Sequence, residues 1–158
     1  MKNDLDHGAW MKEALALARQ AGEEGEIPVG AIVVHHPAEG PVRIVGRGYN
    51  RREAENDPSA HAEIVAMRQA GRELGTWRLV DCTLYVTLEP CPMCAGAMVQ
   101  GRLERVVYGC GDPKAGAVAT LYRLCSDERL NHRVEVVSGI MAEEAAALLK
   151  AFVALRRG

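Results

Sequence analysis

The feature that most constrains this fold is the alternation of short apolar strands with helical segments along the chain. The continuous, β-branched run over residues 29–34 is typical of a strand that is covered on both faces. The predicted strands span 29–34, 42–49, 82–86, 105–108 and 133–137, and the predicted helices span 6–24, 57–74, 90–100, 116–126 and 141–156. An opening hairpin followed by such alternation favours a mixed five-stranded sheet flanked by helices. We therefore predict an α/β fold with three layers, α/β/α, forming one domain over residues 1–158.

Proline and glycine mark the predicted ends of two of these helices. Asp57 is the expected N-cap of the second helix, with Pro58 at its first position. Pro90 is expected to start the third helix, and Gly101 to end it. These two helices carry the residues on which the functional prediction depends.

Composition and charge exclude little but indicate a compartment. The net charge of −2 lacks the basic excess of a duplex-coating protein, so a nucleic-acid substrate would need a local basic patch. The N-terminus shows no secretory signal, and no apolar stretch approaches the length of a membrane span. The five cysteines are an odd number in a chain large enough to need no disulfide. We expect a cytoplasmic protein with no membrane segment.

Cys91 and Cys94 are the first candidate metal ligands. They lie three residues apart at the start of a predicted helix, where the helix dipole and the exposed amides favour thiolates. This pair alone is also compatible with a redox Cys-x-x-Cys or with half of a zinc ribbon. A ribbon would need a second pair, which Cys110 and Cys125 do not form. With Cys82, they are expected to be buried small hydrophobic residues.

His61 and Glu63 remove much of this ambiguity. His-x-Glu followed by Pro-Cys-x-x-Cys is the signature of zinc nucleobase deaminases. We predict that His61, Cys91 and Cys94 bind one zinc ion, leaving the fourth tetrahedral position for water. Glu63 is the predicted catalytic residue, which carries protons from that water to the ring nitrogen and to the departing amine. Residues two apart cannot share a site beside a helix, so the site should lie off the helix N-terminus.

Several segments beyond this signature resemble the bacterial tRNA-specific adenosine deaminase family, and the likeness runs from about Trp10 to Arg157. The stretches that carry it are Pro28–Ala31, Gly48–Arg51, Asp57–Ile64, Leu84–Cys91, Met93–Met98, Gly116–Ala117 and Asn131–Glu135. The resemblance implies a cytidine-deaminase-like fold and conversion of adenosine to inosine at the wobble position of a tRNA anticodon. It also implies a homodimer with one zinc ion per subunit.

The same resemblance implies three substrate contacts and a region that grips tRNA. Asn50 would contact the target nucleotide, the backbone of Ala62 would touch the base edge, and Val29 would line the pocket. Asn50 is also compatible with a plain turn residue that closes the strand. Basic residues expected near the mouth of the site, where the tRNA anticodon loop would bind, are Arg51, Arg52, Lys114, Arg123, Arg129 and Arg133.

Two other functions remain open at this stage. A deaminase of free bases or nucleotides, such as guanine, cytosine or deoxycytidylate, would share every metal residue. A catalytically silent, zinc-stabilised RNA-binding module would not need Glu63.

The sequence departs from the family pattern in two places. Many relatives continue past the last helix with a basic tail, and the Gly109–Lys114 loop has unusual residues here. We expect these departures to affect tRNA affinity rather than chemistry.

Overall fold

The computed structural model describes residues 5–157, so both ends of the predicted domain lie outside the described residues. Five strands form one mixed sheet in the order β2-β1-β3-β4-β5. Their bounds are Gly30–His35 (β1), Arg43–Tyr49 (β2), Cys82–Leu88 (β3), Arg105–Cys110 (β4) and Glu135–Val137 (β5). β1 is antiparallel to β2 and β3, whereas β3, β4 and β5 run parallel. The predicted α/β fold with a mixed five-stranded sheet and an opening hairpin is confirmed.

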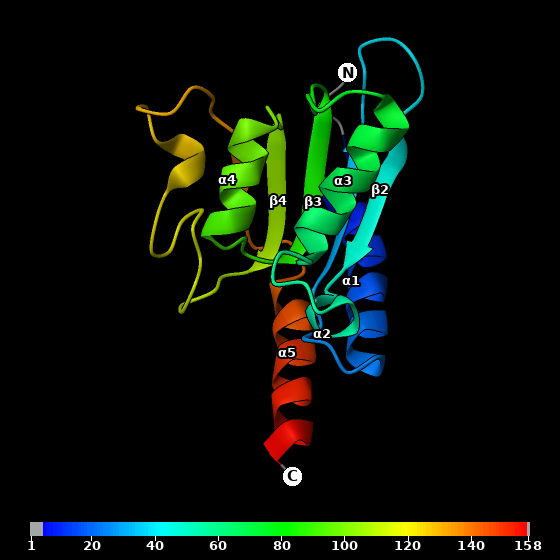
Figure 1. Ribbon diagram of the computed structural model, residues 1–158, viewed down its shortest axis with the longest axis vertical. Helices are drawn as coiled ribbons and strands as arrows, with labels where there is room; N and C mark the ends of the chain where they lie inside the picture. Colours follow the sequence, from blue (N-terminus) through cyan, green and yellow to red (C-terminus); the bar gives the residue numbers. More distant parts are fainter. Residues whose placement is uncertain (1–4, 158) are drawn as a thin grey trace.

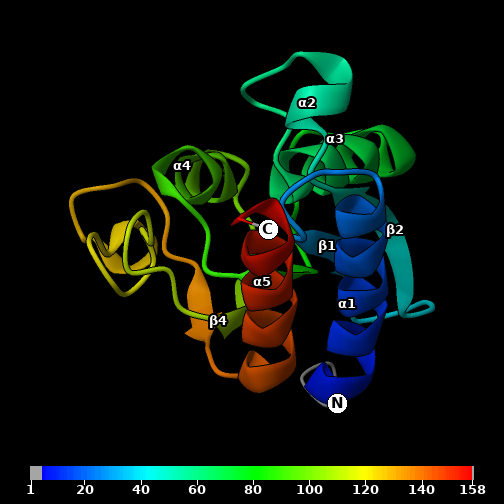
Figure 2. The ribbon, with the colours of Figure 1, turned by 90° about the horizontal axis from the view of Figure 1, so that it is seen from below.

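Helices cover both faces of this sheet. They are His7–Glu23 (α1), Arg52–Glu55 (α2), Ala62–Leu74 (α3), Pro92–Gln100 (α4) and Ala142–Arg157 (α5). α1 and α5 pack on one face and α3 and α4 on the other (Figures 1 and 2). β1 serves both cores, since Ala31 and Val33 face α3 whereas Ile32 and Val34 face α1. Among residues 5–157, no helix has the length and apolar character needed to cross a membrane.

The start of α3 differs from the sequence prediction. The helix begins at Ala62 rather than Asp57, and its N-cap is His61. Asp57 instead accepts hydrogen bonds from the amide and hydroxyl of Ser59 at 2.8 and 2.7 Å, which form a local turn. The Arg51 amide donates to the Ala60 carbonyl at 2.9 Å and so ties this turn to the end of β2. Because this turn occupies the residues before His61, α3 starts only after His61.

The other differences concern helix starts and one segment. α4 begins at Pro92 with Cys91 as its N-cap, two residues later than predicted. The segment 116–126, predicted to be a helix, consists of turns that end in one short 3₁₀ helix, Leu124–Ser126. Its amides at Val118, Ala119 and Thr120 donate to the side chain of Glu89 instead of to helical carbonyls. A long-range carboxylate therefore overrides the local helical pattern. The short helix α2 was not predicted.

Two glycines on β2 bring α3 very close to the sheet. A Cβ atom on Gly46 would lie 2.1 Å from the Ala66 carbonyl oxygen, and one on Gly48 would lie 2.4 Å from that of Ala62. No larger side chain fits between these backbones. The first turn of α3 is thereby held at a fixed height above the strand.

Candidate active site

The ends of two helices bring the predicted metal ligands together. His61 and Cys91 are the N-caps of α3 and α4, and neither side chain caps its own helix. The His61 Nδ1 atom lies 3.5 Å from Cys91 Sγ and 3.6 Å from Cys94 Sγ. All three ligand atoms lie within 4.8 Å of one another, as expected for residues that could hold a metal ion. Converging side chains at two helix starts thus form the site that the spacing predicted.

The two cysteines differ in protonation. Hydrogen bonds from the Cys94 thiol and from His61 lower the pKa of Cys91 to about 4, although burial opposes this shift. The bond to Cys91, together with burial, raises the pKa of Cys94. The pair thus favours the thiolate at Cys91, the form that binds metals, with the Cys94 thiol as its hydrogen-bond donor.

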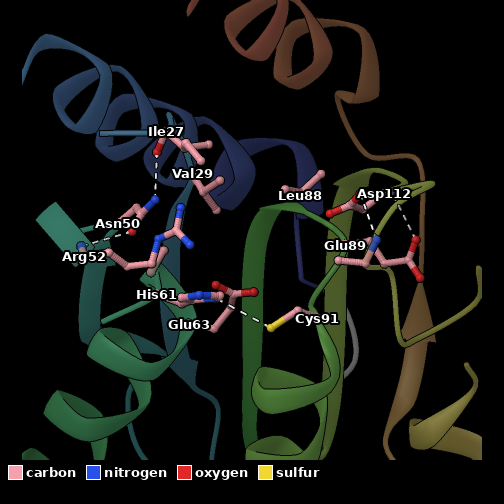
Figure 3. Close-up of a pocket in the computed structure, with 12 residues that line it drawn as sticks. Ile27, Val29, Asn50, Arg52, His61, Glu63, Leu88, Glu89, Cys91 and Asp112 are labelled. Atoms are coloured by element: carbon pink, nitrogen blue, oxygen red, sulfur yellow. Dashed lines mark hydrogen bonds between the residues drawn. The ribbon is translucent and has the colours of Figure 1, made fainter. Parts of the chain in front are cut away.

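Glu63 points into the same space from the first turn of α3 (Figure 3). It is buried, with only 4% of its surface exposed. Burial raises the pKa of Glu63 to about 7, although the charge on His61 opposes the shift. A carboxyl group with a pKa near the working pH can both accept and return a proton, as a general acid–base requires.

A cavity of about 200 Å³ opens in front of Glu63 and His61. This volume is below the roughly 300–1,000 Å³ of pockets for drug-sized ligands, so it suits a single ring system. Ile27, Val29 and Leu88 supply apolar walls. Dry walls strengthen electrostatic interactions inside such a site.

All three residues predicted to contact substrate line this cavity: Val29, Asn50 and Ala62. Asn50 lies across from Leu88 (Figure 3) and also holds the turn after β2. Its Nδ2 donates to the Ile27 carbonyl at 3.4 Å, and its Oδ1 accepts from the Arg52 amide at 3.3 Å. The turn role and the lining role therefore coexist.

The predicted basic residues are less well gathered. Of the six, Arg52 alone lines the cavity. Arg51 pairs with Glu55 at 2.6 Å. Arg129 pairs with Asp127 in its own loop, and Arg133 donates to backbone carbonyls of that loop. That all six lie near the mouth of the site stays a prediction, since these contacts do not test it.

Glu89 is the residue that sequence reasoning missed. It lines the cavity, is 2% exposed and accepts hydrogen bonds from the segment 112–120. Burial would raise the pKa of Glu89, but the Thr120 hydroxyl and the backbone amides outweigh burial and lower it. Its position next to the predicted Pro-Cys-x-x-Cys metal segment, between Leu88 and Pro90, was the only local indication of a role. Its hydrogen-bond donors are some 30 residues away in sequence.

Of the remaining cysteines, Cys82 and Cys125 are buried as predicted, whereas Cys110 is only half-buried.

A mixed sheet that gathers a histidine, two cysteines and a buried glutamate at converging helix starts defines a deaminase domain. The sequence matches the MafB19-like deaminase family over residues 5–157. The chain belongs to this family, and its curated relatives place it among the proteins named tRNA-specific adenosine deaminase.

Three relatives illustrate the relationship. The tRNA-specific adenosine deaminase of Bacillus subtilis (strain 168) is 50% identical over 143 residues, which cover 90% of this chain and 86% of the relative. A structure from a study of A-to-I editing by tRNA:A34 deaminases at the wobble position is 43% identical. It has a TM-score of 0.83 and covers 89% of this chain and 99% of its own. A guanine deaminase from Bacillus subtilis is 39% identical, with a TM-score of 0.61, covering 68% of this chain and 66% of its own.

Proposed function

We propose that this protein deaminates adenosine to inosine at the wobble position of a tRNA anticodon, with zinc as its metal. The observation that carries the chemistry is the placement of His61, Cys91 and Cys94 beside the buried Glu63 in one cavity. The 50% identity to a tRNA-specific adenosine deaminase over most of both chains supports the choice of substrate.

The spacing of the ligand atoms supports zinc. Zn–S bonds of about 2.3 Å and Zn–N bonds of about 2.0–2.1 Å at tetrahedral angles separate nitrogen from sulfur by roughly 3.6 Å. The Nδ1–Sγ distances in this site are 3.5 and 3.6 Å. A zinc ion held there supplies Lewis-acid activation of water.

Glu63 would move the protons of the reaction. Its carboxylate accepts a proton from water as the water oxygen adds to the amine-bearing ring carbon. It returns this proton to the ring nitrogen and then carries the proton of the added hydroxyl to the departing amine, so that the C–N bond breaks, the C=O bond forms and ammonia leaves. The pKa of about 7 supports both directions of transfer.

The cavity walls would select and orient the base. Ala62 lies in the first turn of α3, where backbone N–H groups lack partners within the helix, so its amide could meet a base edge. Asn50 presents an amide side chain to the cavity and would contact the nucleotide, while Val29 packs against the ring. Extruding a base from an anticodon loop costs less than opening a duplex, which suits a small cavity of this kind.

A comparison of substrates tests the proposal. Purified protein should convert adenosine to inosine in an anticodon stem-loop, detected by mass spectrometry of nuclease digests. It should leave free adenosine, cytidine and guanine unchanged. The similarity to a guanine deaminase makes free guanine the second candidate. Turnover of guanine without turnover of the stem-loop would replace the tRNA assignment.

We also propose a homodimer with one zinc ion per subunit, acting in the cytoplasm. An apolar groove on the face formed by α3 and α4, lined by Ile64, Met67 and Trp77, supports a subunit contact there. Trp77 is 59% exposed in the single chain. Light scattering would measure the mass in solution, and Trp77→Lys should lower it to that of a monomer. The free cysteines fit a reducing compartment.

A further inference from the structure

The buried carboxylate of Glu89 binds the loop 112–120, and the proposed reaction assigns this carboxylate no role. The Oε1 atom of Glu89 accepts the amide of Asp112 at 3.1 Å and the hydroxyl of Thr120 at 2.5 Å. Its Oε2 atom accepts the amides of Val118, Ala119 and Thr120 at 3.1, 2.8 and 3.0 Å. Both oxygens are thus filled by donors from the loop 112–120. The carboxylate is therefore engaged in holding the loop.

The backbone holds the same loop against the strand ends. The amide of Ala117 donates to the Pro90 carbonyl at 2.9 Å, and the amide of Glu89 donates to the Cys110 carbonyl at 2.9 Å. Gly116 lies directly on the carboxylate, because a Cβ atom there would come within 2.4 Å of Glu89 Cδ and Oε1. The loop therefore packs on Glu89 without space for any side chain at this position.

This loop forms one wall of the cavity. Asp112 and Ala115 both line it, and Asp112 Oδ1 accepts the Ala115 amide at 3.2 Å. Asp112 and Glu89 lie on one side of the cavity and Asn50 lies on the other, with Cys91 between the two sides (Figure 3). Glu89 precedes Cys91 by two residues, so the same short segment holds the metal ligand and the wall.

We propose that Glu89 is a positioning residue for deamination, which fixes the loop 112–120 relative to Cys91 and so sets the width of the substrate cavity. It acts through Asp112 and Ala115 and does not touch the reacting atoms. This inference rests on the proposed function for its substrate. The loss of Glu89 is expected to weaken substrate binding more than metal binding.

Glu89→Gln tests this role in the zinc-loaded protein. The new amide NH₂ faces backbone donors, which removes at least one hydrogen bond to a charged group. The loss of such a bond corresponds to a change of about tenfold or more. Hydrogen–deuterium exchange at the amides of 118–120 should accelerate by about this factor, and KM for the stem-loop should rise by a similar factor. Zinc stoichiometry should stay at the wild-type value. Thr120→Val, which removes the hydroxyl but keeps the amide, should give a smaller change in the same direction.

A matched variant separates positioning from general loss of stability. Thr83 is buried near the other end of β3, where its hydroxyl accepts from Arg105 at 3.1 Å and contacts His36 at 2.8 Å. Thr83→Val should lower the free energy of unfolding without changing KM or the exchange of 118–120.

Gly116 provides a second, independent check. Gly116→Ala should raise KM in the wild-type background, because the new methyl group collides with the Glu89 carboxylate. In a Glu89→Ala background the collision is removed, so the double variant should be no worse than Glu89→Ala alone.

The outcomes are distinct. Unchanged exchange at 118–120 in folded Glu89→Gln would overturn the inference. Faster exchange with unchanged KM would also overturn it, since the carboxylate would then hold the loop without affecting substrate. A wild-type protein that left the stem-loop unmodified would refute the proposed function. The exchange data would still decide whether Glu89 holds the loop.

Discussion

Gly48 on β2 lies directly against Ala62 at the start of α3, where a Cβ atom would come within 2.4 Å of the Ala62 carbonyl oxygen. Ala62 separates His61 from Glu63, so this backbone contact sets the position of a candidate metal ligand and of the candidate proton carrier together. The three nearest atoms are two backbone atoms and one Cβ atom of α3, and none is the end of a flexible side chain, so an added methyl group must move the first turn of the helix.

Gly48→Ala is therefore expected to lower kcat by at least about tenfold, since small misplacements at a reacting centre are costly. Overpacking should also cost about 1–3 kcal/mol of unfolding free energy. Steady-state kinetics and urea denaturation measure the two effects. Gly8→Ala is the matched control, because its methyl group would make only an ordinary 3.6 Å contact with Asp6. Equal kcat in Gly48→Ala and the wild type would show that the contact does not position the site.

Glu63→Gln should keep its metal and lose most of its turnover. The amide has nearly the same shape but cannot carry protons, and general acid–base groups contribute about 100- to 10,000-fold. Mass spectrometry measures whether the variant keeps its metal, and single-turnover rates on the stem-loop measure the loss of activity. Glu73→Gln, an exposed carboxylate on the same helix, serves as control. A Glu63→Gln protein with wild-type turnover would exclude Glu63 as the proton carrier.

Metal removal should destabilise the fold as well as stop the reaction. The three ligands join the N-terminal ends of α3 and α4, so the bound metal links two helices that otherwise pack through side chains. A ligand present at 1,000 times its Kd stabilises by about 4 kcal/mol. Calorimetry before and after chelation should show a fall in Tm. Cys94→Ala should begin with a lower Tm and respond much less to the chelator. An unchanged Tm in the wild type would argue against a metal link between the helices.

The stability of the protein should fall as the pH drops below about 6.5, in part because of His36. Its side chain is fully buried, its Nε2 contacts Thr83 at 2.8 Å, and among the described residues its Nδ1 has no hydrogen-bond partner. Burial lowers the pKa of His36 from 6.5, although Glu104 opposes the shift. The unfolded chain therefore binds a proton that the folded protein excludes. The free energy of unfolding is therefore greatest above the pKa of His36 in the unfolded chain, and it decreases as the pH falls below that pKa.

His36→Gln should flatten this dependence, since glutamine can keep a hydrogen bond to Thr83 but does not titrate. Urea denaturation between pH 5.5 and 7.5 measures the slope, to which one proton contributes at most about 1.4 kcal/mol per pH unit. Parallel curves for the variant and the wild type would assign the pH dependence to other groups.

Residue patterns close together in sequence predicted much of the fold and of the site. The apolar runs at 29–34 and 105–108 predicted two central strands, since a buried strand needs little besides continuous apolar side chains. The Pro58 signal placed the start of α3 too early, because the turn made by Asp57 and Ser59 uses the residues that would have capped a helix. The pattern over 116–126 failed for a different reason, since its amides are bound by a side chain about 30 residues away.

The sequence by itself determined which groups can do chemistry. The His-x-Glu and Pro-Cys-x-x-Cys spacings name His61, Glu63, Cys91 and Cys94, because side chains at the first turn of a helix project toward a common point. Only the tertiary structure decided how the starts of α3 and α4 come together and which residues enclose the site between them. The contact of Gly48 with Ala62 and the capture of the loop 112–120 by Glu89 join residues far apart in sequence. Local propensity carries no record of such partners, so packing and long-range hydrogen bonds fixed the shape of the cavity.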